Sequence, residues 1–383
     1  MSERQFEEIR GKYPVLEKYV YLDTATTGLI SKDSFNSMVS YLENRYREGM
    51  DIPDYVENWN YADNMRSLVA GAINSEADEV FYGDNCSSIL NVFSSGMDFP
   101  EGSNVISTDL SFPSTPYTWM NPARKNVEIK LARSSNGQVP YDDLVALVDD
   151  KTVAVQLCGV ENTSGFRHDL SRIGRICRDK DILFVVDATQ FIGALEVDVK
   201  EMNIDFLAVS SYKWLNNVFG TGFGYASKRM IEKIEQQYVG WVGNTNRMDH
   251  SAFKLDLASG ARRYETGGLN WTGLRGMKEA LETYLALGKS ETERYIKDLT
   301  EYLYQKVKNT EHIGVVGPFD RVNISGINYL TFPEEWNLND HILRENGIRA
   351  HVAGKNKMRV SVHFYNNRQD IDLLFTFLNG YED

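Results

Sequence analysis

The sequence is poor in cysteine and histidine, the residues on which disulfide frameworks and most zinc sites depend. Its 383 residues include three cysteines, none of them in a CxxC pair, and six scattered histidines without an HxH or HExxH pattern. So few cysteines in so long a chain indicate a reducing compartment and no disulfide framework. The histidine spacing argues against a protein metal site, so we expect no bound metal.

Long apolar runs are also missing. No stretch approaches the roughly 18 residues that a membrane-spanning helix needs, and the charged N-terminus lacks the apolar core of a secretory signal. The 41 Lys and Arg are outnumbered by 54 Asp and Glu, which gives a net charge of −13. A chain this acidic does not bind nucleic acid or an anionic membrane by charge alone. We therefore expect a soluble, cytoplasmic chain of enzyme size, with neither nucleic acid nor membrane as a partner.

What the sequence does contain, through its middle, is an alternation of short apolar runs and helical stretches. The predicted strands are 105–107, 127–131, 152–157, 182–186, 206–209 and 223–226. The predicted helices are 32–48, 61–73, 141–148, 169–178 and 228–237. Continuous apolar strands interleaved with helices are typical of a mostly parallel sheet covered on both faces, so the predicted fold class is α/β.

The pattern changes after about residue 270. A long, charged helical stretch at 272–308 is followed by predicted strands at 326–331 and 358–362 and by a final helix at 368–378. We interpret this part as a second, smaller domain. The expected organisation is an N-terminal segment, 1–30, that packs with the small domain, a large domain, 31–265, and the small domain, 266–383.

Two predicted strands end in residues that can carry chemistry. The run 182–186 leads into Asp187, and the next strand leads through Ser210 and Tyr212 into Lys213. The carboxyl ends of parallel strands meet at one edge of a sheet, where ligands of such folds bind. A carboxylate and a lysine there can form an ordinary salt bridge, or a pyridoxal 5′-phosphate (PLP) site in which the lysine holds the cofactor and the carboxylate pairs with its ring nitrogen. The spacing alone leaves both interpretations open.

Further motifs extend over almost the whole chain. They are YLDTATT at 21–27, VENTSG at 160–165, VVDATQ at 185–190, SSYKW at 210–214 and RVS at 359–361. In this order and spacing the chain resembles the class V aminotransferase family of fold-type I PLP enzymes, which includes cysteine desulfurases, selenocysteine lyases and isopenicillin N epimerase-like proteins. The resemblance implies that fold, PLP as the cofactor, and a homodimer with the cofactor near the interface.

The resemblance also assigns cofactor contacts residue by residue. Lys213 matches the lysine that binds the cofactor covalently, Asp187 the partner of its ring nitrogen, and Gln190 the glutamine at its phenolic oxygen. Asn162 matches the asparagine near that oxygen and the substrate carboxylate, and Phe112 the aromatic residue that stacks on the ring. The remaining predicted cofactor contacts are Asn85, Cys86, Ser87, Ser210 and Tyr212.

Each of the weaker assignments has a plainer alternative. Residues 85–91 resemble a family segment that opens a helix, where free N–H groups suit a phosphate, but they also fit an ordinary capped helix start. Phe112 alone would be interpreted as a core residue. Arg359 matches the arginine that binds the substrate carboxylate, and its alternative is a strand arginine paired with a surface acid.

Two departures from the family pattern bear on the reaction. Desulfurases carry a nucleophilic cysteine on the loop before the arginine, and the corresponding residues 347–358 contain none, which argues against a persulfide-forming desulfurase. His351 in this loop is either a catalytic acid or base or a solvated loop histidine. Gly268 stands where relatives have a threonine that reaches the phosphate of the neighbouring subunit.

The expected chemistry is removal of the Cα proton of a small amino acid by Lys213. Loss of a sulfur from Cβ would then make a lyase, and reprotonation at the cofactor would make an aminotransferase. We favour these two reactions, with an isopenicillin N epimerase-like epimerase as the alternative. A non-catalytic accessory protein of the same fold is disfavoured, because it would not need Lys213, Asp187 and Arg359 together.

Overall fold

The computed structural model describes residues 3–121, 126–251, 253–317 and 319–381. Within these residues the largest sheet has seven strands in the order β2-β8-β7-β6-β5-β3-β4. Five neighbours, from β7 to β4, run parallel, while β8 and β2 add antiparallel strands at one edge. The expected α/β class with a mostly parallel sheet is confirmed. The strands are β2 (Val80–Gly83), β3 (Ser103–Thr108), β4 (Val127–Ala132), β5 (Thr152–Cys158), β6 (Leu183–Asp187), β7 (Phe206–Ser210) and β8 (Gly222–Ala226).

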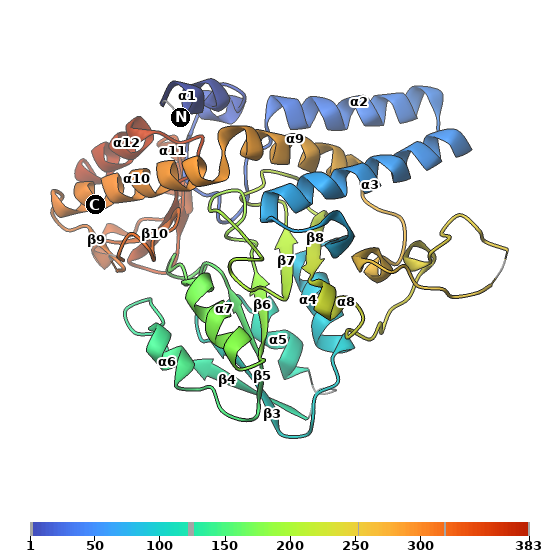
Figure 1. Ribbon diagram of the computed structural model, residues 1–383. Helices are drawn as coiled ribbons and strands as arrows, with labels where there is room; N and C mark the ends of the chain where they lie inside the picture. Colours follow the sequence, from blue (N-terminus) through green and yellow to red (C-terminus); the bar gives the residue numbers. More distant parts are fainter. Residues whose placement is uncertain (1–2, 122–125, 252, 318, 382–383) are drawn as a thin grey trace.

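Both faces of this sheet are covered by helices (Figure 1). Successive side chains of a strand point to opposite faces, so Phe184 and Val186 of β6 pack in one apolar cluster and Leu183 and Val185 in another. The first cluster includes α3 (Ile52–Ile73), α7 (Leu170–Asp179) and α9 (Trp271–Leu287). The second includes α4 (Cys86–Gly96), α5 (Ser114–Met120) and α8 (Lys228–Ile231). Burial on both faces explains why these strands are apolar throughout.

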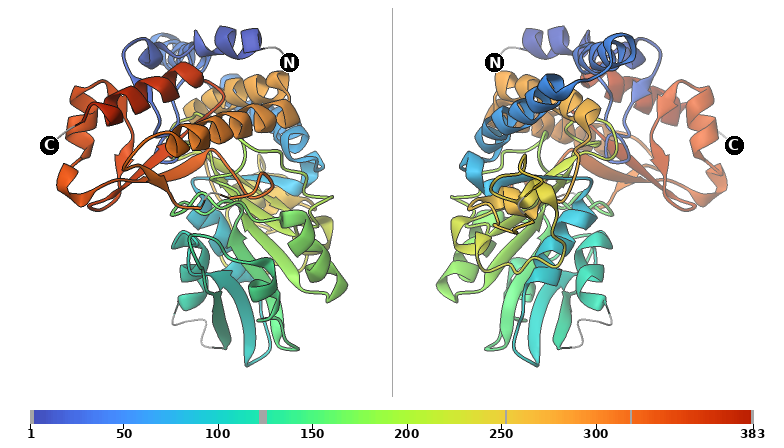
Figure 2. Two further views of the ribbon diagram at one scale, coloured as in Figure 1. Left: turned by 90° about the vertical axis from the view of Figure 1, so that its left-hand side faces the viewer. Right: turned by 90° about the vertical axis from the view of Figure 1, so that its right-hand side faces the viewer.

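The C-terminal part forms a second layer of sheet and helices beside one end of the large sheet, drawn in orange to red (Figure 2). Its antiparallel sheet has the order β12-β13-β10-β9. The strands are β9 (Gly314–Val315), β10 (Ile327–Thr331), β12 (His351–Val352) and β13 (Lys357–Ser361). The helices are α10 (Lys289–Lys308), α11 (Asp340–Glu345) and α12 (Arg368–Asn379).

The N-terminal segment packs against this C-terminal part. Its elements are α1 (Glu3–Arg10), the 3-10 turn η1 (Pro14–Glu17) and β1 (Val20–Tyr21), which pairs in parallel with β11 (Ile348–Arg349). The Arg10 guanidinium lies 2.7 Å from a carboxylate oxygen of Asp370 at the start of α12, near which α1 lies in Figure 1. Phe6 of α1 stacks on Tyr295 of α10 with ring centres 3.9 Å apart.

Several expected boundaries were wrong, for local reasons. The predicted helix over 272–308 is two helices, because Gly288 between α9 and α10 has φ +78° and breaks the hydrogen-bond ladder. Helix α3 begins nine residues before the predicted 61, at Ile52, where Asp51 and Asp54 form a capping box. Helix α8 ends at Ile231 instead of 237, and strand β2 was not expected. The helices not yet named are the long α2 (Lys32–Glu48) and the short α6 (Tyr141–Val145), η2 (Ala77–Glu79), η4 (Trp241–Gly243), η5 (Ala261–Tyr264) and η6 (Glu334–Trp336).

Helix α2 also differs from a simple amphipathic helix that covers a core. Met38 is buried against Gly276 of α9, but Phe35, Leu42 and Tyr46 are exposed at 57%, 48% and 88%. One face of α2 therefore leaves an apolar surface uncovered in the single chain. None of the helices in the described part of the chain combines the length and the hydropathy that a membrane-spanning segment needs.

Candidate active site

Three neighbouring parallel strands of the large sheet end at one rim. The last residue of β5, Cys158, pairs with Asp187 at the end of β6, and Asp187 pairs with Ala208, two residues before the end of β7 at Ser210. Lys213 follows β7 by three residues. Cys158, Asp187, Ser210 and Lys213 all line one cavity of about 320 Å³. The sheet therefore brings the predicted lysine and carboxylate into the same pocket, as parallel strand ends should.

Lys213 is buried at the base of this pocket. Its Nζ lies 5.4 Å from the centre of the Phe112 ring and 5.7 Å from that of Tyr212. Burial lowers the pKa of Lys213, and the positive charge of Arg359 lowers it further, against the opposing effect of Asp187. A lysine with a lowered pKa loses its proton more readily, which suits a nucleophile and a general base.

Asp187 is held between a backbone donor and two buried thiols. Its Oδ1 accepts the N–H of Thr189 at 2.9 Å, and its Oδ2 lies 3.9 Å from the Sγ of Cys158. Burial raises the pKa of the Cys86 and Cys158 thiols well above the ordinary value, and the negative charge of Asp187 adds to the effect. Both thiols are therefore kept protonated and are poor nucleophiles.

The start of α4 also lines the pocket. Asn85 caps the helix, because its Oδ1 accepts the Ser88 N–H at 2.9 Å. Its side chain thus forms the ordinary helix cap that was the alternative to a phosphate contact. The Cys86 N–H donates to Ser210 Oγ at 2.8 Å, and the Ser87 hydroxyl lies 2.6 Å from that of Ser114. Hydroxyls and a helix N-terminus together suit an anionic group. Ser114 was not among the predicted residues.

Gln190, Asn162 and Tyr212 line the same pocket. The Gln190 amide is oriented by two bonds, from its Nε2 to the Ala25 carbonyl at 3.1 Å and from the Trp214 indole to its Oε1 at 2.6 Å. The Asn162 Oδ1 is buried and has no hydrogen-bond partner among the described residues. A buried acceptor without a partner is costly, so it indicates a position for a ligand group.

The aromatic wall is formed by Phe112 and Tyr212. Phe112 is 42% exposed and lines the cavity, unlike a core residue, and its N–H approaches the Cys158 sulfur at 3.3 Å. Tyr212 stacks on Phe219 with ring centres 4.1 Å apart. Cys158, Thr189 and Phe219 were not predicted to line the pocket. Their only signal in the sequence is their position next to a strand end or after the lysine.

Arg359 does not line the Lys213 pocket; it lies on β13 of the small sheet. Its guanidinium is buried, and Nη2 donates to Asp23 Oδ1 at 3.2 Å and to the Thr26 hydroxyl. Its Nε is buried without a partner among the described residues. Arg359 is thus no surface salt bridge, and part of its donor fork is available. The YLDTATT motif contains Asp23 and Thr26, but their role in holding the arginine was not predicted.

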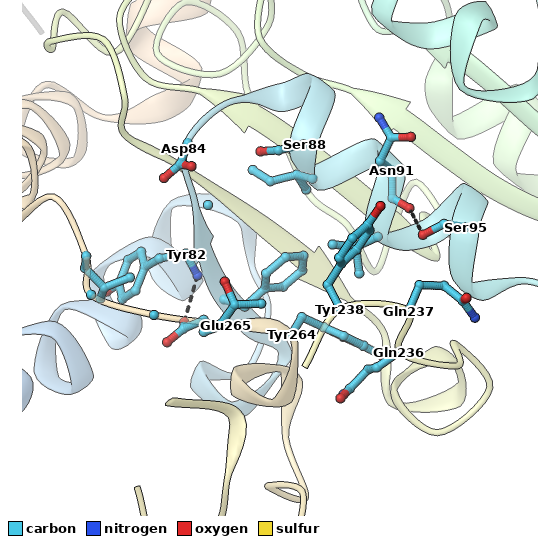
Figure 3. Close-up of a pocket in the computed structure, with 18 residues that line it drawn as sticks. Tyr82, Asp84, Ser88, Asn91, Ser95, Gln236, Gln237, Tyr238, Tyr264 and Glu265 are labelled. Atoms are coloured by element: carbon cyan, nitrogen blue, oxygen red, sulfur yellow. Dashed lines mark hydrogen bonds between the residues drawn. The ribbon is translucent and has the colours of Figure 1, made fainter. Parts of the chain in front are cut away.

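The segment around Gly268 borders a second cavity of about 350 Å³, which shares Asp84 with the cofactor pocket (Figure 3). Glu265 anchors the segment, because its carboxylate accepts the Tyr82 N–H at 2.8 Å and lies 2.7 Å from the Arg66 guanidinium. Beyond this anchor, a side chain added at Gly267 or Gly268 would meet no atom within 4 Å. The segment is therefore fixed at one end and faces open space at its glycines.

Comparison with known proteins decides the family. The model of the aminotransferase class-V family matches residues 20–374. The chain belongs to this family. A probable cysteine desulfurase of Methanothermobacter thermautotrophicus is 28% identical, with 96% of each chain covered.

Solved structures agree in fold. A cysteine desulfurase from Thermococcus onnurineus NA1 in its apo form superposes with a TM-score of 0.85 at 22% identity, covering 97% of each chain. The cystine C-S lyase C-DES, solved with its product cysteine persulfide, reaches 0.88 at 19% identity over 97% of this chain and 100% of that one. The predicted fold-type I architecture is confirmed.

The chain is therefore a PLP-dependent enzyme of the class V aminotransferase family. Its pocket fits the cofactor on structural grounds, because it joins a buried lysine, a buried carboxylate, an anion-binding helix start and the unpartnered Asn162 oxygen. The individual contacts of the site residues remain predictions, since the family assignment concerns the whole chain.

Proposed function

We propose that this protein is a C–S lyase that cleaves L-cysteine or an S-substituted cysteine and releases the sulfur to solvent. The observation that carries the proposal is a pocket that joins a lysine and a carboxylate but has no reactive thiol near it. Residues 347–358, all of them described, contain no cysteine. The three cysteines of the chain are buried free thiols. A mechanism that transfers sulfur to a protein cysteine therefore lacks its acceptor.

The proposed mechanism assigns a task to each residue. When bound, PLP supplies an electron-accepting ring that makes the Cα proton of the amino acid acidic. Lys213 removes that proton as general base, and Asp187 keeps the proton on the ring nitrogen. Arg359 binds the α-carboxylate through its free donors. The Cα–H electron pair then forms the Cα–Cβ double bond, and the Cβ–S bond breaks with its electrons on sulfur.

The experiment that tests the proposal is a panel of amino acids with product identification by mass spectrometry. We expect L-cysteine or an S-substituted cysteine to give pyruvate, ammonia and a free thiol or sulfide in equal amounts. A 2-oxo acid that retains the sulfur would show an aminotransferase, and a D-amino acid product would show an epimerase. Either result as the main reaction would contradict the lyase proposal.

We also propose that the enzyme is a cytoplasmic homodimer. The exposed apolar side chains of α2 support association, and the open glycines at 267 and 268 support a site that a second copy completes. Three free thiols in one chain favour a reducing compartment. Light scattering should give the mass of two chains, and a fully active monomer would contradict the dimer.

A further inference from the structure

Three residues form a row across the small sheet. Arg359 on β13 pairs directly with Tyr329 on β10 and, on its other side, with His351 on β12. Side chains of directly paired residues in antiparallel strands lie on the same face, about 5 Å apart at Cβ. The Arg359 side chain on this face reaches Asp23 and Thr26. His351 therefore stands beside the arginine, on the face that turns toward the substrate.

The His351 ring is oriented by Asp340, the first residue of α11. Its Nδ1 lies 3.2 Å from Asp340 Oδ2, and the other oxygen of Asp340 accepts the Val352 N–H. Among the described residues nothing hydrogen-bonds to Nε2 of His351, and the side chain is 44% exposed. A carboxylate that binds one ring nitrogen fixes the orientation of the ring and leaves the other nitrogen to exchange a proton.

The two flanks of Arg359 differ in access. On one flank, the Tyr329 hydroxyl donates to the Asn162 carbonyl at 3.1 Å. This bond holds Tyr329 against the large domain. On the other flank, a groove of about 860 Å³ opens beside Asp340 and Asp23. Tyr21 and Arg349 also line the groove. The His351 flank of Arg359 is therefore the more open one, because the His351 side chain is 44% exposed whereas Tyr329 is buried.

Apart from Lys213, the side chains that line the cofactor pocket offer the departing sulfur only weak acids. Serine hydroxyls are weak acids, and burial raises the pKa of the Tyr212 hydroxyl and of the Cys86 and Cys158 thiols. After it takes the Cα proton in the proposed mechanism, Lys213 is itself an acid that can return this proton to the sulfur. A thiolate is a poorer leaving group than a thiol, so a second acid on the open flank of Arg359 would speed its departure further.

We propose that His351, oriented by Asp340, is the general acid that protonates the departing sulfur. As the Cβ–S bond breaks, its electron pair takes the proton from Nε2 of the imidazolium, which becomes neutral imidazole and regains a proton from water. The product is a free thiol or hydrogen sulfide. This role rests on the lyase function proposed above.

The test compares two leaving groups in the PLP-loaded enzyme. His351→Gln should lower the rate of sulfide release from L-cysteine on the order of 10²-fold, because general acid catalysis is typically worth that factor. Pyruvate formation from β-chloro-L-alanine should remain near the wild-type rate, because chloride leaves without a proton. The control is His312→Gln, an exposed histidine between α10 and β9 that lines neither the cofactor pocket nor the groove and should affect neither substrate. Equal losses on both substrates, or no loss on either, would overturn the role of His351.

A second measurement does not depend on turnover. Nitrogen-15 NMR of the histidine rings should show the neutral His351 ring with its proton on Nδ1 in the wild type and on Nε2 in Asp340→Ala. The same tautomer in both proteins would show that Asp340 does not orient the ring. If wild-type enzyme releases no thiol or sulfide from any cysteine derivative, the lyase function fails and this role fails with it. If the wild-type enzyme does release a thiol or sulfide, and His351→Gln releases sulfide from L-cysteine at the same rate, the lyase function stands and only the role of His351 fails.

Discussion

The rim of the large sheet and the face of the small sheet build the site in different ways. At the rim, Asp187 ends β6, while Ser210 ends the neighbouring strand β7 and Lys213 follows it. The parallel pairing of these two strands is enough to place the three residues together. On the small sheet, Arg359 meets Tyr329 and His351 through antiparallel pairing and Asp23 through the N-terminal segment. To the rim we assign the binding of the cofactor and the removal of the Cα proton. The small sheet holds the groups that we assign to substrate binding and to the fate of the sulfur.

The largest effect should come from the rim. Lys213→Ala should abolish nearly all turnover and the visible absorbance of the lysine-bound cofactor, because no other described side chain of the pocket carries an amine. Absorbance spectra and product assays check this, with the exposed Lys233→Ala as control. Borohydride reduction followed by peptide mapping should label Lys213, and a label on another lysine would show that the site assignment is wrong.

The Asp187→Asn variant should separate binding of the cofactor from the electronic activation of its ring. The variant should still bind PLP, though more weakly, because Lys213 and the start of α4 are unchanged. Exchange of the Cα proton for deuterium should slow roughly 10²- to 10⁴-fold, since the carboxylate no longer stabilises the charge on the ring nitrogen. NMR of the substrate measures this exchange. An unchanged rate would exclude the assigned role of Asp187.

On the small sheet, Arg359→Lys should lower kcat/KM for the best amino-acid substrate on the order of 10²-fold. Lysine cannot offer the planar fork that binds a carboxylate with two parallel bonds. The cofactor absorbance should be unaffected, because Arg359 does not line the cofactor pocket. Amines that lack the α-carboxylate should react equally with both proteins. Wild-type kcat/KM in the variant would remove Arg359 from the site.

A smaller effect should appear where the two sheets meet, at the buried His363. Its Nε2 donates to the Trp214 carbonyl at 2.9 Å, and its Nδ1 accepts the Phe364 N–H at 2.7 Å. Burial lowers the pKa of His363 from 6.5 to about 3. Between pH 6.5 and pH 3, His363 therefore binds a proton in the unfolded chain and stays neutral in the folded chain. The free energy of unfolding falls as the pH falls from 6.5 toward 3.

Within that range, His363 should lower the free energy of unfolding by about 1.4 kcal/mol for each pH unit that the pH falls. Urea unfolding at pH 7 and pH 5 measures it, and His363→Gln should lose less stability between the two pH values than the wild type. The comparison uses the slope with pH, so it holds even where the variant is less stable throughout. Equal slopes would show that His363 does not account for the acid sensitivity.

The contrast between the two sheets also explains what the sequence could predict. Apolar runs followed by Asp187 and Lys213 predicted both the strands and their shared edge, since a parallel strand is recognised locally. The exposed face of α2 could not be foreseen, because periodicity finds an apolar face without showing what covers it. The break at Gly288 was missed because a single glycine is tolerated within many helices.

The surroundings of Arg359 were the hardest part to predict. The resemblance supplied the arginine itself, but its contacts with Asp23 and Thr26 join residues more than 300 positions apart. Nothing in the local pattern sets the register that places His351 opposite Arg359. Such pairings depend on tertiary packing, which single-sequence periodicity does not contain.

The measurement that tests the central claim most directly is the intact mass of the protein during turnover of L-cysteine, with sulfide and pyruvate quantified in the same samples. We predict that the protein mass shows no added sulfur atom and that free sulfide accumulates in step with pyruvate. A persulfide trapped on Cys86, Cys158 or Cys177 in proportion to turnover would contradict the claim that this enzyme releases sulfur without a protein-bound intermediate.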